Sequence, residues 1–230
     1  MKKLPLLFIA CTLYINSNAQ ESTPSKPYYF SSCSELIFSF GNVESKPLEP
    51  SNIVRFSCFL HLAEQFHYNF NQSLGFYTGL SLRNVGLIND LNDTIKVKQR
   101  VYTLGLPLAL KFGNMEKETY GTVGVEGELA LNYKQKVFVN DEKTKSNIWF
   151  SNRTNLFLPS VFAEVKFKNG FYLKFKYYLT DFLTEDKQKI NVSGVEYNPT
   201  ESQMMYVGLG FVIRDKNLNK KSNSSNMNNL

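Results

Sequence analysis

The sequence has 230 residues, of which 43% are hydrophobic, 20% charged and 14% aromatic, and its formal net charge is +6. Apolar and aromatic side chains are too abundant, and charge too low, for an intrinsically disordered protein, and the length suits one domain. The longest apolar stretch, residues 4–15, is shorter than the roughly 18 residues that a membrane-spanning helix needs. Composition therefore excludes a helical membrane protein, but not every membrane protein.

The first residues have the pattern of a secretory signal peptide. Met1-Lys2-Lys3 is a short basic start, and residues 4–15 form an apolar core. Ser17-Asn18-Ala19 then places small residues at positions −3 and −1 of a cleavage site before Gln20. We expect residues 1–19 to be removed after export across the inner membrane, which leaves a mature chain with a net charge of +4.

From Ser34 onward the hydrophobic pattern has a period of two. Between residues 102 and 112, for example, every even position is Leu or aromatic, whereas the odd positions are polar, small or Pro. Such alternation predicts strands with one apolar and one polar face. Eight strands are expected, at residues 34–43, 53–70, 74–88, 98–112, 119–135, 156–168, 171–182 and 203–214.

The connections between these strands alternate in length. Residues 71–73, 113–118 and 169–170 form short connections, and residues 44–52, 89–97, 136–155 and 183–202 form longer ones. Outer-membrane barrels have short periplasmic turns and longer external loops. The pattern therefore predicts an all-β protein, an eight-stranded antiparallel up-and-down transmembrane β-barrel with both ends of its ring on the periplasmic side.

The composition of the two faces separates a membrane barrel from a soluble, lipocalin-like one. A soluble barrel turns its apolar face inward, and an outer-membrane barrel turns it toward lipid. Aromatic residues lie near the ends of the predicted apolar faces, as in interfacial girdles: Phe66, Tyr68, Phe70, Tyr102, Phe112, Tyr133, Phe171 and Tyr177. Small residues suited to a narrow interior lie on the polar faces: Gly75, Gly79, Ser81, Gly105, Gly124, Gly208 and Gly210. Both features favour a barrel in the cell outer membrane, with the soluble barrel as the alternative.

The predicted inward face carries many charges. The candidate network inside the barrel consists of Arg55, Arg83, Lys111, Glu126, Glu128, Glu164, Lys166, Lys174 and Lys176. Eight strands enclose a space that side chains just fill, so charges buried there must pair with one another. The alternative is a weakly anion-selective pore or a bound anionic ligand. Because Glu126 and Glu128, like Lys174 and Lys176, are two residues apart, each pair shares a face, and we expect pairing across the barrel.

No motif points to catalysis or to a cofactor. The sequence lacks a Gly-x-Ser-x-Gly motif, a P-loop, a dinucleotide fingerprint and a Cys-x-x-Cys pair. His61 lies on the opposite face from Glu64, and Ser57 is four residues from His61, about 13 Å along a continuous strand. We therefore expect no enzyme activity, no cofactor and no metal. The net charge of +2 over residues 20–214 does not support nucleic-acid binding.

The two longest predicted loops are candidates for partner binding. Residues 136–155 contain Ile148-Trp149-Phe150 among mixed charges, and residues 183–202 contain a further mixed segment. Exposed aromatic residues among charges are typical of interaction surfaces, but the same residues could extend the strands beyond the membrane. Outer-membrane lipid and the outer-membrane assembly machinery are the other expected partners. Cys33 and Cys58 could pair or serve as small apolar residues.

Residues 102–112 form a strand with an aromatic start, a Leu-Pro-Leu centre and a basic-aromatic end, and Gly121–Gly127 forms a Gly-rich strand. Both segments resemble outer-membrane β-barrel proteins of the porin family, PorT-like proteins of Bacteroidetes-type bacteria. The hairpin from Phe162 to Tyr178 has the same likeness, which spans residues 30–213 in all. One departure is the Asn-, Ser- and Lys-rich segment 215–230, predicted to be a disordered tail after a barrel domain at 20–214.

The function expected from these patterns is a structural or interaction role through the extracellular loops. The resemblance to PorT-like proteins implies an accessory role in secretion. A small pore or transport protein and an outer-membrane lipid-modifying enzyme are the alternatives.

Overall fold

The structure is a computed structural model, and it describes residues 27–45, 49–140, 142–185, 187, 189–192 and 194–214. The predicted signal peptide (1–19) and tail (215–230) lie outside the described residues. Within the described part of the chain, no helix is long and apolar enough to cross a membrane.

The described residues form strands joined by turns and loops. The strands are β1 (Tyr28–Ser45), β2 (Ser51–Ile53), β3 (Arg55–Ser57), β4 (Leu62–Asn69), β5 (Leu74–Asn92), β6 (Ile95–Asn114), β7 (Thr119–Val139), β8 (Glu142–Trp149), β9 (Phe157–Lys166), β10 (Phe171–Tyr178), β11 (Ile190–Val192), β12 (Val195–Tyr197) and β13 (Pro199–Arg214).

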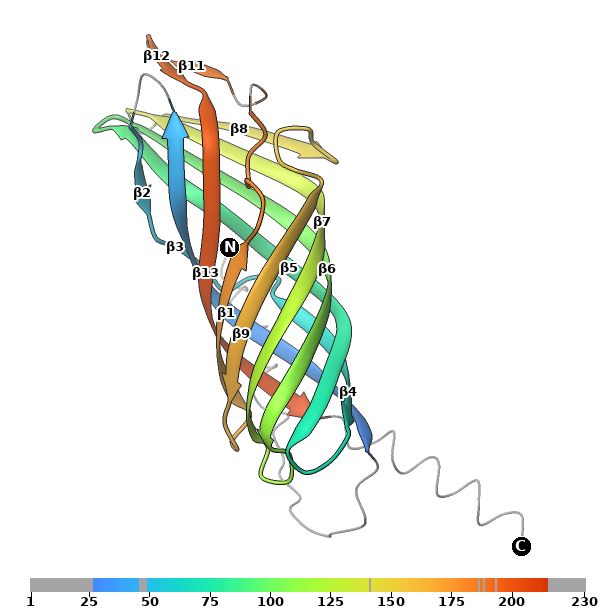
Figure 1. Ribbon diagram of the computed structural model, residues 1–230. Coiled ribbons are helices and arrows are strands. Elements are labelled where there is room, and N and C mark those ends of the chain that lie inside the picture. The colour runs from blue at the N-terminus through green and yellow to red at the C-terminus, as the bar shows by residue number, and fades with distance from the viewer. Residues whose placement is uncertain are drawn as a thin grey trace, which may run out of the picture.

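Eight strand positions close into a ring (Figure 1). Its order is β1, β4, β5, β6, β7, β9, β10 and β13, every neighbouring pair is antiparallel, and β13 pairs back with β1. The short strands β2 and β3 precede β4 at the second position, where β3 pairs with β1 and β2 with β5. The predicted all-β, eight-stranded antiparallel barrel is confirmed.

One end of the barrel carries only short turns, at residues 70–73, 115–118 and 167–170, and is called the short-turn end. Ser31 of β1 lies opposite Arg214 of β13 there, so both ends of the ring meet at this end.

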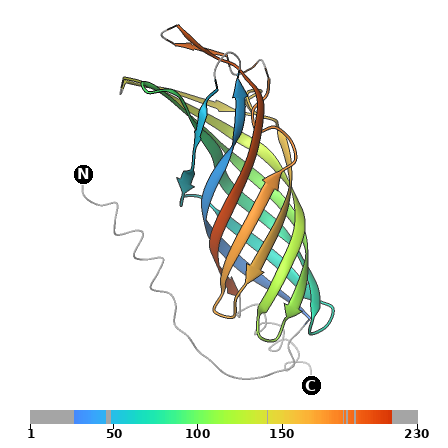
Figure 2. The ribbon, with the colours of Figure 1, turned by 60° about the vertical axis from the view of Figure 1, so that its left-hand side comes forward.

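The opposite, long-hairpin end is built differently from the prediction. The predicted connection 89–97 is wrong, because β5 and β6 stay paired as far as Asn92 and Ile95. Residues 136–155 are largely strand, since β7 and β8 pair from Val139 to Asn132. Within residues 183–202, β11 and β12 form a small hairpin. Strand extension is thus the arrangement found at this end, and β5 to β8 project to one side of the barrel (Figure 2).

The alternation of side chains turns the apolar face outward. On β6, the five even positions from Leu104 to Phe112 are between 41% and 59% exposed, whereas Lys111 between them is fully buried. Exposed apolar side chains of the same kind occur on the other ring strands, including Leu36, Leu80, Val125, Val161, Leu173 and Leu209. This outward set is called the apolar belt. It is the reverse of a soluble barrel and is typical of barrels that cross a membrane.

Tyr133 does not lie in an outer aromatic girdle as predicted. Thr103 pairs with Ala130 and Tyr102 with Asn132, which leaves Leu131 as an extra residue in β7. This β-bulge reverses the alternation beyond it. Tyr133 consequently points inward and is 1% exposed.

Side chains fill the interior in layers. At the long-hairpin end, Tyr178, Tyr197 and Tyr206 are fully buried in a cluster of apolar residues. Tyr172 lies nearer the short-turn end, against Cys33 and Ala63. The backbone of Gly210 leaves room for Tyr172, because a Cβ at Gly210 would lie 2.1 Å from the Tyr172 ring.

Candidate functional site

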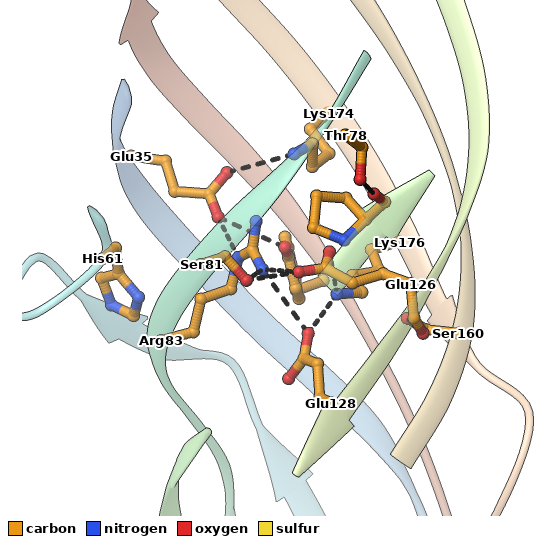
Figure 3. Close-up of polar contacts among 12 residues, drawn as sticks. Glu35, His61, Thr78, Ser81, Arg83, Glu126, Glu128, Ser160, Lys174 and Lys176 are labelled. Carbon is orange, nitrogen blue, oxygen red and sulfur yellow. Dashed lines mark hydrogen bonds and ion pairs between the residues drawn. The ribbon is translucent and has the colours of Figure 1, made fainter. Parts of the chain in front are cut away.

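Two carboxylates of β7 and one lysine of β10 form the centre of a charge network inside the barrel (Figure 3). Glu126 and Glu128 are two residues apart, so both point inward, and both are essentially fully buried. The Lys176 Nζ donates to Glu126 Oε2 at 2.7 Å and to Glu128 Oε1. These ion pairs pass through the interior between β7 and β10, which are separated in the ring by β9.

Arg83 of β5, which is separated from β7 by β6, joins the same carboxylates from the other side (Figure 3). Its Nη1 contacts Glu126 Oε1 and lies 3.6 Å from Glu128 Oε1. Its Nε donates to Glu35 Oε1 at 2.6 Å. Glu35, on β1, was missing from the predicted network. It shares the odd-numbered inward face of β1 with the buried Ser31 and Ser39, which is the signal that could have identified it.

Lys174 and several tyrosines complete this central cluster. The Lys174 Nζ lies 3.2 Å from Glu164 Oε2 and 4.0 Å from Glu35 Oε2. The hydroxyls of Tyr172 and Tyr206 donate to Glu35 at 3.2 and 3.3 Å, and Tyr178 donates to Glu128. Three cations, four carboxylates and three hydroxyls thus pair with one another inside the barrel.

Two residues of the predicted network, Lys111 and Lys166, lie in a second cluster near the short-turn end. The Lys111 Nζ donates to Asn69 Oδ1 at 2.6 Å and lies over the Tyr29 ring. The Lys166 Nζ pairs with Glu118, in the turn before β7, at 3.1 Å.

Arg214 also pairs with Glu118, at 3.3 Å. Burial alone would raise the pKa of the Glu118 carboxyl, but the charges of Lys166 and Arg214 outweigh it and hold the pKa below its usual value.

Arg55 stands apart from both clusters. Its guanidinium donates to the backbone oxygen of Asn84 at 3.0 Å and to Asn84 Oδ1 at 2.8 Å. No carboxylate pairs with it within the described ranges. The hollow beside the central cluster, lined by Glu35, His61 and Arg83 among others, has no room for a water molecule.

Ser57 and His61 are closer than predicted. The His61 Nε2 lies 2.8 Å from Ser57 Oγ, whereas the sequence suggested about 13 Å. The prediction was wrong because the strand is interrupted between β3 and β4, where Leu60 has a φ of 58°.

The hydrogen bonds around His61 do not activate Ser57. The backbone N–H of Asn84 donates to His61 Nδ1 at 3.3 Å, so Nε2 carries the hydrogen and donates to Ser57. The Ser57 Oγ also accepts from Arg55. A histidine in this tautomer holds Ser57 in place and does not take its proton.

His67, Cys33 and Cys58 are the other residues of a type that could carry chemistry, and each has different surroundings. His67 bonds with Ser31 at 2.8 Å and stacks on Tyr29. Cys33 is buried, Cys58 is exposed, and both thiols are free. In the part of the chain that the structure covers, no three His, Cys, Asp or Glu residues are grouped to hold a metal ion.

The fold resembles solved structures of bacterial surface barrels at low sequence identity. The outer membrane protein OprG of Pseudomonas aeruginosa has 11% identity and a TM-score of 0.36, over 82% of this chain and 96% of that one. The outer membrane protein AlkL, solved in lipid bilayers, has 11% identity and a TM-score of 0.36, over 88% and 98%. Ail, the attachment invasion locus protein of Yersinia pestis, has 11% identity and a TM-score of 0.33, over 80% and 99%. No family model and no curated protein matches the sequence.

Proposed function

We propose that this protein is an outer-membrane barrel whose closed interior serves as an anchor and whose long-hairpin end acts outside the cell. The observation that carries the proposal is the apolar belt around a charged interior. In water, a row such as Leu104 to Phe112 would be a large exposed apolar patch, which soluble monomers avoid. In a bilayer the same row faces lipid.

A role through contacts is favoured over conduction. Arg83, Lys174 and Lys176 are neutralised by carboxylates, and the apolar cluster with Tyr197 and Tyr206 fills the barrel above them. Eight strands leave little space beyond such side chains. A filled interior supports an anchor rather than a pore.

The external end supplies the surface for partners. β5, β6 and β7 have 19, 20 and 21 residues, whereas a tilted strand crosses a bilayer with about 9–11. The excess projects beyond the apolar belt, so the segments 136–155 and 183–202 are the proposed partner surfaces. The resemblance to PorT-like proteins adds an accessory role in secretion to this proposal, and its support is the pattern of residues 102–127.

The first test is location. The full-length protein should fractionate with the outer membrane and migrate on gels in a heat-modifiable manner. An epitope inserted at Asp93-Thr94 should bind antibody on intact cells, and the same epitope at Glu116-Lys117 should bind only after permeabilisation. Recovery in the soluble fraction would refute the proposal.

Two further measurements address the alternative functions. Discrete current steps in planar bilayers would establish a pore, and none are expected. Altered lipid A in an overexpressing strain would establish a lipid-modifying enzyme, and unchanged lipid A is expected because Ser57 is not activated by His61.

A further inference from the structure

Beyond the apolar belt, the outward face of β6, β7 and β8 carries first a row with aromatic residues and then rows of cations. Tyr102, Asn132 and Trp149 lie opposite one another and form the first row. Arg100 and Lys134 form the next row. Aromatic residues thus separate the belt from cations, which is the order found at the edge of a membrane.

The third row contains three directly opposed lysines. Lys98 is the register partner of Lys136, and Lys136 is the partner of Lys145. Residues opposite each other on antiparallel strands have Cβ atoms about 4.5–5.5 Å apart, and like charges there are destabilising. An anion bound along the row would offset this repulsion.

Aromatic rings hold these cations on one surface. Arg100 and Lys134 both lie over the Tyr102 ring, at 5.7 and 5.4 Å. Lys98 and Lys143 both lie over the Phe138 ring, at 5.2 and 5.7 Å. The set of Lys98, Arg100, Lys134, Lys136, Lys143 and Lys145 is called the cationic patch.

Glu49, Asp90 and Asp93 line a hollow beside Lys98 and Phe138, but none of these carboxylates forms an ion pair with the patch in the described part of the chain. Asp90 pairs with Lys96, outside the patch, at 3.4 Å. Over the described residues no ion pair reaches any of the six cations, and the buried Nε of Arg100 has no hydrogen-bond partner. Burial, followed by the neighbouring charges of Lys143 and Arg100, lowers the pKa of Lys136.

We propose that the cationic patch binds the phosphate groups of lipids in the leaflet at the long-hairpin end. The Arg100 row lies about 7 Å along the strand from the Tyr102 row, and the Lys98 row about 13 Å. If the acyl chains of a leaflet cover Leu104, Trp149 lies at the membrane interface. The phosphate groups of that leaflet then lie level with the Arg100 and Lys98 rows. The rows of the patch continue the outward face of the apolar belt through the Tyr102 row, which favours a lipid over a soluble polyanion. The inference rests on the proposed membrane insertion.

The test uses the purified mature chain in detergent, with retention of heat-modifiable migration as proof that the barrel is folded. Binding of lipid A, a diphosphorylated glycolipid, is measured by titration and by native mass spectrometry. The triple variant Lys98→Gln, Lys136→Gln and Lys145→Gln should bind roughly a hundredfold more weakly, since each cation near a charged lipid surface contributes about fivefold. Raising the salt concentration should weaken binding by the wild-type protein.

A matched variant controls for net charge. Lys117→Gln and Lys168→Gln remove two exposed lysines outside the patch, and Lys216→Gln removes a third from the predicted tail. This triple variant should bind lipid A as the wild-type protein does. Dephosphorylated lipid A should not bind measurably.

Equal binding of both lipid forms, or undiminished binding by the patch variant, would overturn the inference. Tighter binding of dextran sulfate or inorganic phosphate than of lipid A would do the same, by assigning the patch to a soluble anion. Because these outcomes are read on a folded barrel, they leave the outer-membrane proposal intact, and only the fractionation result tests that proposal.

Discussion

Replacing Arg83 with Met should destabilise the barrel more than any other single removal of an interior cation. Arg83 contacts Glu35, Glu126 and Glu128, and its side chain is 3% exposed. Without it, the two remaining central cations, Lys174 and Lys176, face all four carboxylates. Breaking a buried ion pair by removing one partner costs about 3–5 kcal/mol, so the free energy of unfolding should fall by that amount.

Arg55→Met is the matched control. This variant also removes one positive charge from the barrel interior, but the hydrogen-bond partners of Arg55 are the neutral Asn84 and Ser57. Loss of these hydrogen bonds costs about 1–2 kcal/mol. Urea unfolding in detergent micelles, followed by gel mobility and tryptophan fluorescence, measures both variants.

A double variant isolates the ion pair. Glu35→Gln in the Arg83→Met background should recover part of the lost stability, because among the described residues Glu35 then retains only Lys174, at 4.0 Å, as an ion-pair partner. Equal costs for Arg83→Met and Arg55→Met, with no recovery in the double variant, would refute the idea that the carboxylates depend on Arg83.

Two further predictions concern the short-turn end and the packing of the interior. Glu118→Gln should lower the free energy of unfolding by about 1 kcal/mol or less at pH 7. The pKa of Glu118 is lowered in the folded state, so its contribution to stability is present above pH 4.5, the usual pKa, and is lost as the pH falls through the lowered pKa. The stability difference between the variant and the wild-type protein should therefore shrink on acidification. A difference that grew would contradict this. Gly210→Val should cost at least 1–3 kcal/mol, since its Cβ would overlap the Tyr172 ring. Gly121→Val, whose Cβ would have only one neighbour, at 3.9 Å, should cost much less in the same unfolding assay.

The ring of eight strands was predictable because each strand repeats a period of two over many residues. The even positions from Leu104 to Phe112 face outward as the alternation predicted. The same alternation placed Glu126, Glu128 and Lys176 inside, where they pair with one another, and Lys174 inside, where it pairs with Glu164.

The errors occur where the strands are irregular. The bulge at Leu131 turns Tyr133 inward, and the interruption at Leu60 brings His61 to Ser57. Neither irregularity follows from local alternation, because each depends on how a strand pairs with its neighbours. The pairing of β5 with β6 through residues 89–97 was also missed, since outside the belt both faces of a strand can be polar. Strand extension over residues 136–155 was one of the two alternatives that the sequence left open.

The position of a single tryptophan tests the central claim most directly. In a Trp149→Phe background, which removes the only native tryptophan, Leu108→Trp places the probe in the middle of the apolar belt, and Asp93→Trp places it at the tip of the β5–β6 hairpin. In vesicles whose lipids carry bromine near the bilayer centre, the tryptophan at position 108 should emit at short wavelength and be strongly quenched, and the one at position 93 should not. Unquenched, water-exposed emission from position 108 would contradict the assignment of the apolar belt to lipid.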